Sequence, residues 1–124
     1  MISGIGIDII EVARVEKLSK KEDKFLKKIF TQIEIDYCRK FRNGAQNFAG
    51  RFAVKEAFLK AMGTGFSNGL KFNEVETVND ELGKPEMVLY GKTKEILEER
   101  DLKCVHVSIA HLKDYATAVV IIEK

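Results

Sequence analysis

The sequence predicts an α+β domain in which helices pack on a small, mostly antiparallel sheet. Two apolar segments, 104–110 and 117–123, are joined by a short turn near Lys113 and Asp114, which predicts a hairpin. Isoleucines alternate with other residues over 2–10, which predicts a further strand. Helix-like segments fill much of the chain between these strands, so both kinds of structure belong to the same fold.

The first half of the chain is predicted to be mainly helical. Residues 12–29 fit either one helix or two helices with a break. Thr31 followed by Glu34 matches a capping box, so the next helix should begin there and run to about Arg42.

The longest predicted helix spans about 46–62, and Gly63 is well placed to end it in the left-handed conformation. Residues 63–70 include three glycines and are predicted to form a loop. The remaining predicted elements are two strands and a helix, at 71–78, 86–90 and 92–101.

The composition limits the classes of protein that the chain can belong to. Its 124 residues, 45% of them hydrophobic, suit one compact domain over 1–124. The 21 basic and 19 acidic residues leave a net charge of only +2, which does not favour a nucleic-acid binder. No apolar run approaches the ~20 residues of a membrane span, and Asp8 and Glu11 interrupt the early apolar stretch. Cys38 and Cys104 form no paired motif, so we expect a soluble protein of a reducing compartment, the cytoplasm.

The segment FAGRFAVKEAFLKAMGTG, at 48–65, combines a largely apolar helix with four charges. Glu56 and Lys60 are four residues apart and therefore neighbours on the helix surface. Ala49 and Ala53 lie beside them on the helical wheel. One interpretation is an ordinary surface ion pair. The other is a ligand site, in which the small alanines leave room for a bound molecule.

Asp8 lies in the first strand on the face that carries Gly4 and Gly6. Aspartate and glycine are both unfavourable inside strands, and glycine there often marks the close approach of a backbone or a ligand. Asp8 is either a solvated acid on an edge strand or a carboxylate that projects into a cleft. In the second case, Asp8 and Glu56 would offer two oxygen ligands to a hard cation such as Mg²⁺. Spacing alone does not show that the two carboxylates meet.

Basic residues recur at helical spacing near the N-terminus, at Arg14, Lys17, Lys21, Lys24 and Lys28. On a continuous helix they would line one face, which is either a solvated surface or a docking surface for an acidic partner. Arg39, Lys40 and Arg42 form a second basic cluster, which could hold a phosphate.

His111 ends the strand SIAH, and strand ends often carry functional side chains. The sequence therefore singles out His111 as a candidate functional residue.

Three segments together closely resemble the holo-acyl-carrier-protein synthases, the short 4′-phosphopantetheinyl transferases. They are GIGIDIIEVARVEK at 4–17, FAGRFAVKEAFLKAMGTG at 48–65 and VSIAHLKDYATAVV at 107–120. The resemblance implies the 4′-phosphopantetheinyl transferase fold and a homotrimer with active sites between subunits. It also implies a Mg²⁺-dependent enzyme of fatty acid biosynthesis. Such an enzyme transfers 4′-phosphopantetheine from coenzyme A to a serine of apo-acyl carrier protein and releases adenosine 3′,5′-bisphosphate.

The resemblance also implies roles for particular residues. Asp8 and Glu56 match the metal ligands of the family, whereas Ile10 stands where the larger members carry a further acid. Glu56, directly or through a water on the metal, is the candidate base for the serine proton. Lys60, or alternatively Lys55, would stabilise the leaving bisphosphate.

The other implied roles concern coenzyme A and the carrier protein. The candidates for binding coenzyme A are Arg51, Lys60, Gly63, Gly65 and His111. Arg14, Lys17 and Lys21 are the candidates for docking the acidic carrier protein. Two other interpretations stay open at this point: a non-catalytic module that binds an acidic protein, and a nucleic-acid binder that uses the cluster from Arg39 to Arg42.

Overall fold

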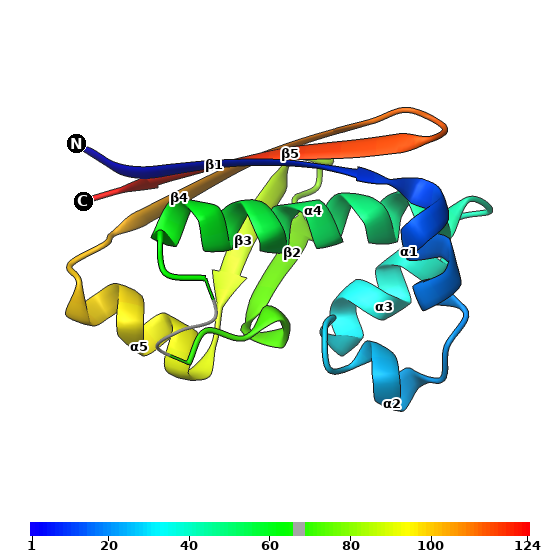
Figure 1. Cartoon of the computed structure of the whole chain (residues 1–124), viewed down its shortest axis with the longest axis horizontal. Helices are drawn as coiled ribbons and strands as arrows, with labels where there is room; N and C mark the ends of the chain where they lie inside the picture. The colour runs from blue at the N-terminus through cyan, green and yellow to red at the C-terminus, as the bar shows by residue number, and fades with distance from the viewer. Residues whose placement is uncertain (66–68) are drawn as a thin grey trace.

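The computed structural model describes residues 1–65 and 69–124, and it confirms the predicted α+β class. A three-stranded antiparallel sheet has the order β1-β5-β4, formed by β1 (Ile2–Glu11), β5 (Tyr115–Glu123) and β4 (Cys104–His111). The long helix α4 (Gly44–Met62) runs along one face of this sheet (Figure 1). The predicted C-terminal hairpin is confirmed, because β4 pairs with β5 over its whole length.

Three short helices lie between β1 and α4, at α1 (Val12–Ser19), α2 (Asp23–Leu26) and α3 (Gln32–Arg39). The segment 12–29 is therefore two helices with a break, one of the two alternatives left open by the sequence. The predicted capping box is present, because Thr31 and Glu34 exchange both of its hydrogen bonds.

A second, two-stranded antiparallel sheet pairs β2 (Val75–Asn79) with β3 (Pro85–Leu89), and α5 (Gly91–Glu99) follows it. The prediction of a strand from residue 71 is wrong, because Phe72–Glu74 form a 3₁₀ helix, η1. Tertiary hydrogen bonds explain the difference: the carboxylate of Glu74 accepts bonds from the backbone of Lys92 and Thr93 at the start of α5.

Helix α4 is buried on nearly every side, as its apolar circumference predicted. Two groups of core residues meet along it, one under the three-stranded sheet and one against α1 and α3. Ala49 and Ala53 are fully buried in these groups. The prediction that they leave room for a ligand is therefore wrong, since close packing already fills the space around them.

The glycines of β1 allow α4 to approach the sheet closely. A Cβ atom on Gly6 would lie 1.8 Å from the carbonyl oxygen of Ala57, and one on Gly4 would lie 2.1 Å from that of Ala61. Only glycine fits at this distance, because the obstructing atoms belong to the helix backbone. The face of β1 that carries Asp8 therefore points toward α4.

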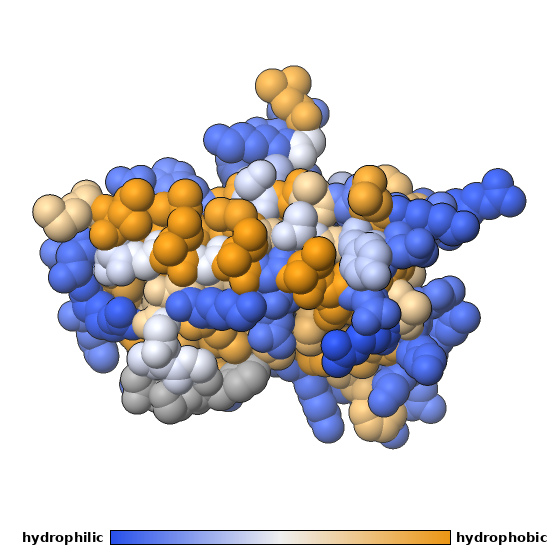
Figure 2. Space-filling model, turned by 45° about the horizontal axis from the view of Figure 1, so that its top comes forward, coloured by the Kyte–Doolittle hydropathy of each residue, from blue (hydrophilic) through white to orange (hydrophobic). Residues whose placement is uncertain are grey.

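The opposite face of the three-stranded sheet is open and apolar. Ile5, Ile7 and Ile9 of β1 are between 62% and 67% exposed. In Figure 2 a band of hydrophobic side chains follows this edge of the molecule. Among the residues described, no helix is long and apolar enough to cross a bilayer.

Candidate active site

Asp8 and Lys60 form an ion pair between β1 and α4. Lys60 Nζ lies 3.0 Å from Asp8 Oδ1 and also donates a hydrogen bond to the carbonyl oxygen of Ile7. The side chain of Asp8 is 16% exposed, whereas that of Lys60 is 55% exposed. Asp8 is thus on an edge strand, as one interpretation had it, but α4 shields its carboxylate from most of the solvent.

Glu56 lies one helical turn before Lys60 and is half-buried. Its pKa is raised above the ordinary value, first by burial and second by the negative charge of Asp8, while the positive charge of Lys60 opposes the shift. The two carboxylates and the ammonium are therefore close enough to interact. The surface-pair interpretation joined Lys60 to Glu56, but the structure joins Lys60 to Asp8.

The chemistry of this group suits a hard divalent cation. Asp8 and Glu56 present carboxylate oxygens, and Mg²⁺ commonly takes only one or two protein carboxylates. The repulsion that raises the pKa of Glu56 is the kind that a bound cation relieves. No group of three or more His, Cys, Asp or Glu side chains gathers at a metal-binding distance in the two described ranges, 1–65 and 69–124.

Lys55, the alternative to Lys60, faces a different side of α4. Its side chain is fully buried, and its ammonium lies 2.7 Å from Glu34 Oε1. It also donates hydrogen bonds to the carbonyl oxygens of Phe72 and Val75. Burial lowers the pKa of Lys55, and the carboxylate of Glu34 opposes that shift. These contacts occupy Lys55 away from Asp8, so Lys60 is the lysine at the carboxylate pair.

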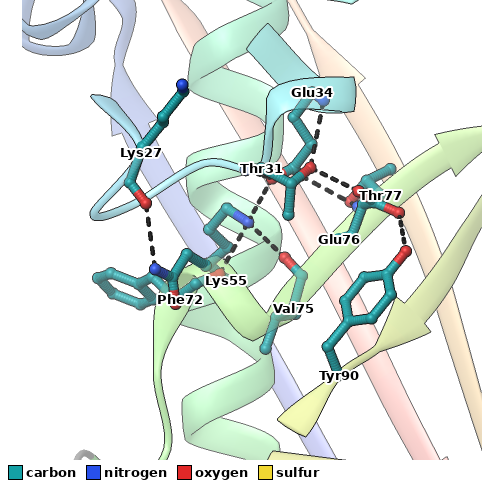
Figure 3. A network of polar contacts seen from close by, with 10 residues as sticks. Lys27, Thr31, Glu34, Lys55, Phe72, Val75, Glu76, Thr77 and Tyr90 are labelled. Atoms are coloured by element: carbon teal, nitrogen blue, oxygen red, sulfur yellow. Dashed lines mark hydrogen bonds and ion pairs between the residues drawn. The ribbon is translucent and has the colours of Figure 1, made fainter. Parts of the chain in front are cut away.

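The ion pair of Lys55 belongs to a buried polar network that joins α3, α4 and β2 (Figure 3). Besides Lys55, Glu34 accepts hydrogen bonds from the backbone N–H groups of Thr31 and Thr77. The neighbouring carboxylate of Glu76 accepts bonds from the hydroxyls of Thr31 and Tyr90. No local pattern in the sequence encodes this network, but Lys55 lies beside Phe48 and Leu59 on the helical wheel. A lysine in such an apolar sector is a signal for a buried ion pair.

Arg51 and His111 line one cavity of about 230 Å³ between α4, the end of β4 and the β2–β3 hairpin. The Arg51 guanidinium stacks 4.1 Å from the Tyr37 ring centroid and donates a 2.6 Å hydrogen bond to Asn79. Arg51 is only 4% exposed, and within the part of the chain that the structure describes its Nε has no hydrogen-bond partner. Asp8 does not line this cavity, so the structure does not bring Arg51 and His111 to the carboxylate pair within one chain.

Gly63 ends α4 in the left-handed conformation with φ of 79°, as predicted. Gly65 also has a positive φ, of 56°, and both glycines have open space where a Cβ would lie. They follow Lys60 in the chain, Gly63 as the C-cap of α4 and Gly65 two residues later. Of the predicted loop 63–70, residues 66–68 lie outside the described part of the chain.

The predicted docking residues do not share one continuous helix. Arg14 and Lys17 are exposed on α1, whereas Lys21 follows the end of that helix. Lys21 instead approaches the ring of Phe25, which Lys24 and Lys28 also approach, at 5.1 to 5.9 Å. Phe25 is 43% exposed, so the basic surface also carries an aromatic side chain.

A family model for the 4′-phosphopantetheinyl transferase superfamily matches residues 4–120. The match includes most of β1 with Asp8, the whole of α4 and β4, and the first part of β5. The fold and the candidate site thus lie within one class of transferase, and the class predicted from the sequence is confirmed.

Curated relatives narrow this class. The chain is 48% identical to the holo-[acyl-carrier-protein] synthase of Syntrophus aciditrophicus, over 99% of this chain and 97% of that protein. It is 46% identical to the one of Clostridium tetani over the same shares. The chain belongs to the holo-acyl-carrier-protein synthase family within the 4′-phosphopantetheinyl transferase superfamily.

Solved structures agree with this assignment. The synthase of Neisseria meningitidis superposes with a TM-score of 0.89 at 36% identity, with 100% of both chains covered. The synthase of Bacillus anthracis, solved in complex with CoA (3′,5′-ADP), gives 0.81 at 39% identity over 100% of this chain and 98% of the other. The fold predicted from the resemblance is therefore confirmed.

Proposed function

We infer that this protein transfers the 4′-phosphopantetheine group of coenzyme A to a serine hydroxyl of apo-acyl carrier protein. Family membership supports the reaction. The observation that carries the inference for this chain is the convergence of Asp8, Glu56 and Lys60, where β1 meets α4. The two carboxylates and the ammonium group at this place are the kinds of group that a phosphoryl transfer requires.

Magnesium is the metal that we propose for this site, held by Asp8 and Glu56. When bound there, Mg²⁺ would neutralise charge on the pyrophosphate of coenzyme A. With Ile10 on the same face of β1 in place of a further acid, the protein offers two carboxylates, which lie within the usual number for Mg²⁺.

The chemical step then uses two side chains of α4. The serine oxygen attacks the β-phosphorus of coenzyme A, and the bond from that phosphorus to the adenosine 3′,5′-bisphosphate oxygen breaks. Glu56, directly or through a water on the metal, accepts the serine proton. Lys60 offsets the negative charge that develops on the leaving bisphosphate. Its half-exposed ammonium can shift from Asp8 toward that group.

Coenzyme A binding would involve two separate parts of the chain. One part is Lys60, which pairs with Asp8, together with Gly63 and Gly65, which follow it at and beyond the end of α4. The other part is the separate cavity that Arg51 and His111 line, where the Arg51 guanidinium would donate hydrogen bonds to a phosphate oxygen. These two parts do not meet within one chain, so a second copy must complete each site.

A homotrimer would provide that second copy. The open apolar face formed by Ile5, Ile7 and Ile9 supports assembly, because monomeric proteins rarely leave such a surface uncovered. We propose that copies of the chain meet over this face. The free thiols of Cys38 and Cys104 support a reducing location, for which we propose the cytoplasm.

The carrier protein would dock on the exposed residues Arg14, Lys17 and Lys21. Acyl carrier proteins are acidic, so opposite charges would guide their approach and orient the reacting serine. The half-exposed ring of Phe25, which Lys21 approaches, would add an apolar contact beside these charges.

Mass spectrometry of the carrier protein tests the function directly. The protein is incubated with coenzyme A, Mg²⁺ and apo-acyl carrier protein, and we expect the carrier to gain the mass of one phosphopantetheine group. A carrier whose serine is replaced by alanine is the control and should gain nothing. An unchanged mass of the intact apo-carrier would contradict the proposed function.

A further inference from the structure

We propose that Lys55, which touches no predicted substrate, is a positioning residue that fixes the place of the Glu56 carboxylate through its ion pair with Glu34. The proposal deepens the proposed function and rests on the role given there to Glu56 as a metal ligand. It concerns the buried polar network of Figure 3, in which Lys55 pairs with Glu34, whereas Asp8 pairs with Lys60.

Each proton of the Lys55 ammonium has a partner in a different element. Glu34 Oε1 belongs to α3, the carbonyl of Phe72 belongs to η1, and the carbonyl of Val75 begins β2. Hydrogen bonds are directional, so three bonds that converge from three elements hold the ammonium at one point. Apolar packing elsewhere around α4 has no comparable directionality.

The carboxylate of Glu34 is also held by several bonds. The backbone N–H of Thr31, the N-cap of the same helix, donates to Oε1, and that of Thr77 in β2 donates to Oε2. Glu34 and Lys55 are both 0% exposed. The anchor of α4 is thus a rigid part of the protein rather than a mobile surface pair.

A preference for stability does not account for this pair. Replacing a buried ion pair with apolar side chains of similar size is often neutral or even stabilising. A buried pair can instead specify one arrangement among several that pack nearly as well. Here the arrangement that it specifies is the rotation of α4 about its own axis.

The rotation of α4 matters because Glu56 is the next residue. Successive residues are about 100° apart around a helix, so the anchor on one side sets the direction of the neighbouring side chain. A turn of about 10° would move the end of a side chain by about 1 Å. Displacements of that size are enough to disturb a catalytic constellation.

The side of α4 that faces β1 provides no equivalent anchor in its packing. Gly4 and Gly6 meet the backbone of Ala57 and Ala61 without a side chain between them. This contact sets the distance between α4 and β1, but it has no interlocking side chain that would resist a rotation of α4 about its axis. Lys60 does bond to β1, but its side chain is half-exposed and is the one expected to turn toward the substrate.

Metal binding by folded protein tests the proposal. Mn²⁺ replaces Mg²⁺ as a spectroscopic probe, and its affinity is measured by electron paramagnetic resonance with coenzyme A present. We expect Lys55→Met to weaken Mn²⁺ binding about tenfold or more, as the loss of a supporting residue at a metal site typically does. We also expect kcat to fall, with KM for the carrier protein nearly unchanged, because the docking surface is intact.

Two further variants separate positioning from folding. The double variant Glu34→Gln with Lys55→Met removes both charges of the ion pair instead of leaving Glu34 without its partner, so it should fold even if Lys55→Met alone does not. It should still bind Mn²⁺ weakly. Val54→Ala removes buried volume beside Lys55 but leaves the network intact, so its thermal midpoint should fall while its Mn²⁺ affinity stays that of the wild type.

Wild-type Mn²⁺ affinity in the folded double variant would overturn the proposal, and so would an equal loss of affinity in Val54→Ala. Failure of the proposed metal site has a different signature. In that case Glu56→Gln would bind Mn²⁺ as well as the wild type does, which would remove the basis of both proposals.

Discussion

Glu56 combines a proposed chemical role with an energetic cost. Burial and the charge of Asp8 raise its pKa, so its ionised form is less favourable in the folded protein than in the unfolded chain. Residues of active sites often carry such a cost, because function and stability place different demands on the same position. The cost gives Glu56 a measurable signature that does not depend on catalysis.

We predict that Glu56→Gln abolishes most transfer activity and yet raises the thermal stability near pH 7. A raised folded pKa means that the folded protein holds this proton more tightly than the unfolded chain does. Wild-type stability therefore falls as pH rises from 4.5, the ordinary pKa of a glutamate side chain, through the raised value. Glutamine has no such dependence, so its advantage should be full at neutral pH and absent at about pH 3.

Thermal unfolding at the two pH values, together with the mass assay, measures both effects. Glu95→Gln, on the exposed face of α5, is the matched control and should change neither property. A Glu56→Gln protein that transfers at the wild-type rate would exclude Glu56 as the base. A variant that is less stable than the wild type at pH 7 would show that the ion pairs of this region outweigh the burial of Glu56.

Asp8, Glu56 and Lys60 could be chosen from the sequence because each is conspicuous there. Asp8 breaks the apolar pattern of a strand, and the other two share a helical face. Lys55 and Glu34 were not recognised as a pair, since their contact spans 21 residues and no local pattern encodes it. Glu34 was identified only as part of the capping box, which is a local signal.

Among the elements, the contact between β1 and α4 depends most sharply on residue size. The glycines of β1 meet backbone atoms of the helix, which cannot rotate aside as a side chain can. This contact places Asp8 of β1 near Glu56 of α4. The separation of the two elements is therefore also the separation of the proposed metal ligands.

We predict that Gly6→Ala strongly destabilises the protein, because the new Cβ would lie 1.8 Å from the carbonyl oxygen of Ala57. Overpacking of this kind typically costs about 1–3 kcal/mol or more in the free energy of unfolding. Gly50→Ala is the matched control. Its Cβ would meet only the Ile109 Cγ2 methyl group, at 3.1 Å, and it removes a glycine from the interior of a helix.

Chemical denaturation of the three proteins provides the comparison. The Gly50→Ala protein should unfold at about the wild-type denaturant concentration or above it, and Gly6→Ala well below. Equal midpoints for Gly6→Ala and the wild type would mean that β1 and α4 can separate without loss.

The element boundaries show where local patterns were sufficient. The hairpin of β4 and β5, the capping box and the glycine end of α4 were all predicted, because each depends on neighbouring residues. The 3₁₀ helix at Phe72–Glu74 was not, because it depends on distant residues: Lys55 donates to the carbonyl oxygen of Phe72, and the backbone N–H of Thr93 in α5 donates to the carboxylate of Glu74. The predicted length of α4 is nearly correct. The prediction that Ala49 and Ala53 leave room for a ligand is wrong, because a helical wheel does not show which elements pack against each side of the helix.

At the scale of the whole molecule, the sheet has one face covered by α4 and one face open. The open face carries the isoleucines of β1 (Figure 2), and a water-exposed apolar surface of this kind favours association. The cavity of Arg51 and His111 and the carboxylate pair also lie apart in one chain. Assembly of several copies would cover the open apolar face and could bring the cavity of one copy to the carboxylate pair of another.

We predict that Ile7→Lys dissociates the assembly into monomers and removes activity, because a charge would be buried at the interface. Light scattering coupled to size-exclusion chromatography gives the mass of the particle. Ile33→Lys is the control: Ile33 is similarly exposed, at 56% against 62% for Ile7, but lies on α3, away from the sheet. Its particle mass and activity should be unchanged. A monomeric wild-type protein with full activity would contradict the trimer.

Glu34 has a consequence for how the chain acquires its structure. Its carboxylate closes a local ring with Thr31, three positions away, and also contacts Lys55, 21 positions away, and Thr77, 43 positions away. Ordering a glutamate side chain costs conformational entropy, and long-range contacts cost more because a longer segment must close. We predict that a local ring formed early lowers the cost of the longer contacts, because the oxygen atoms would already point inward when α4 and β2 pack against them. The capping signal at the start of α3 would then also help to nucleate tertiary structure.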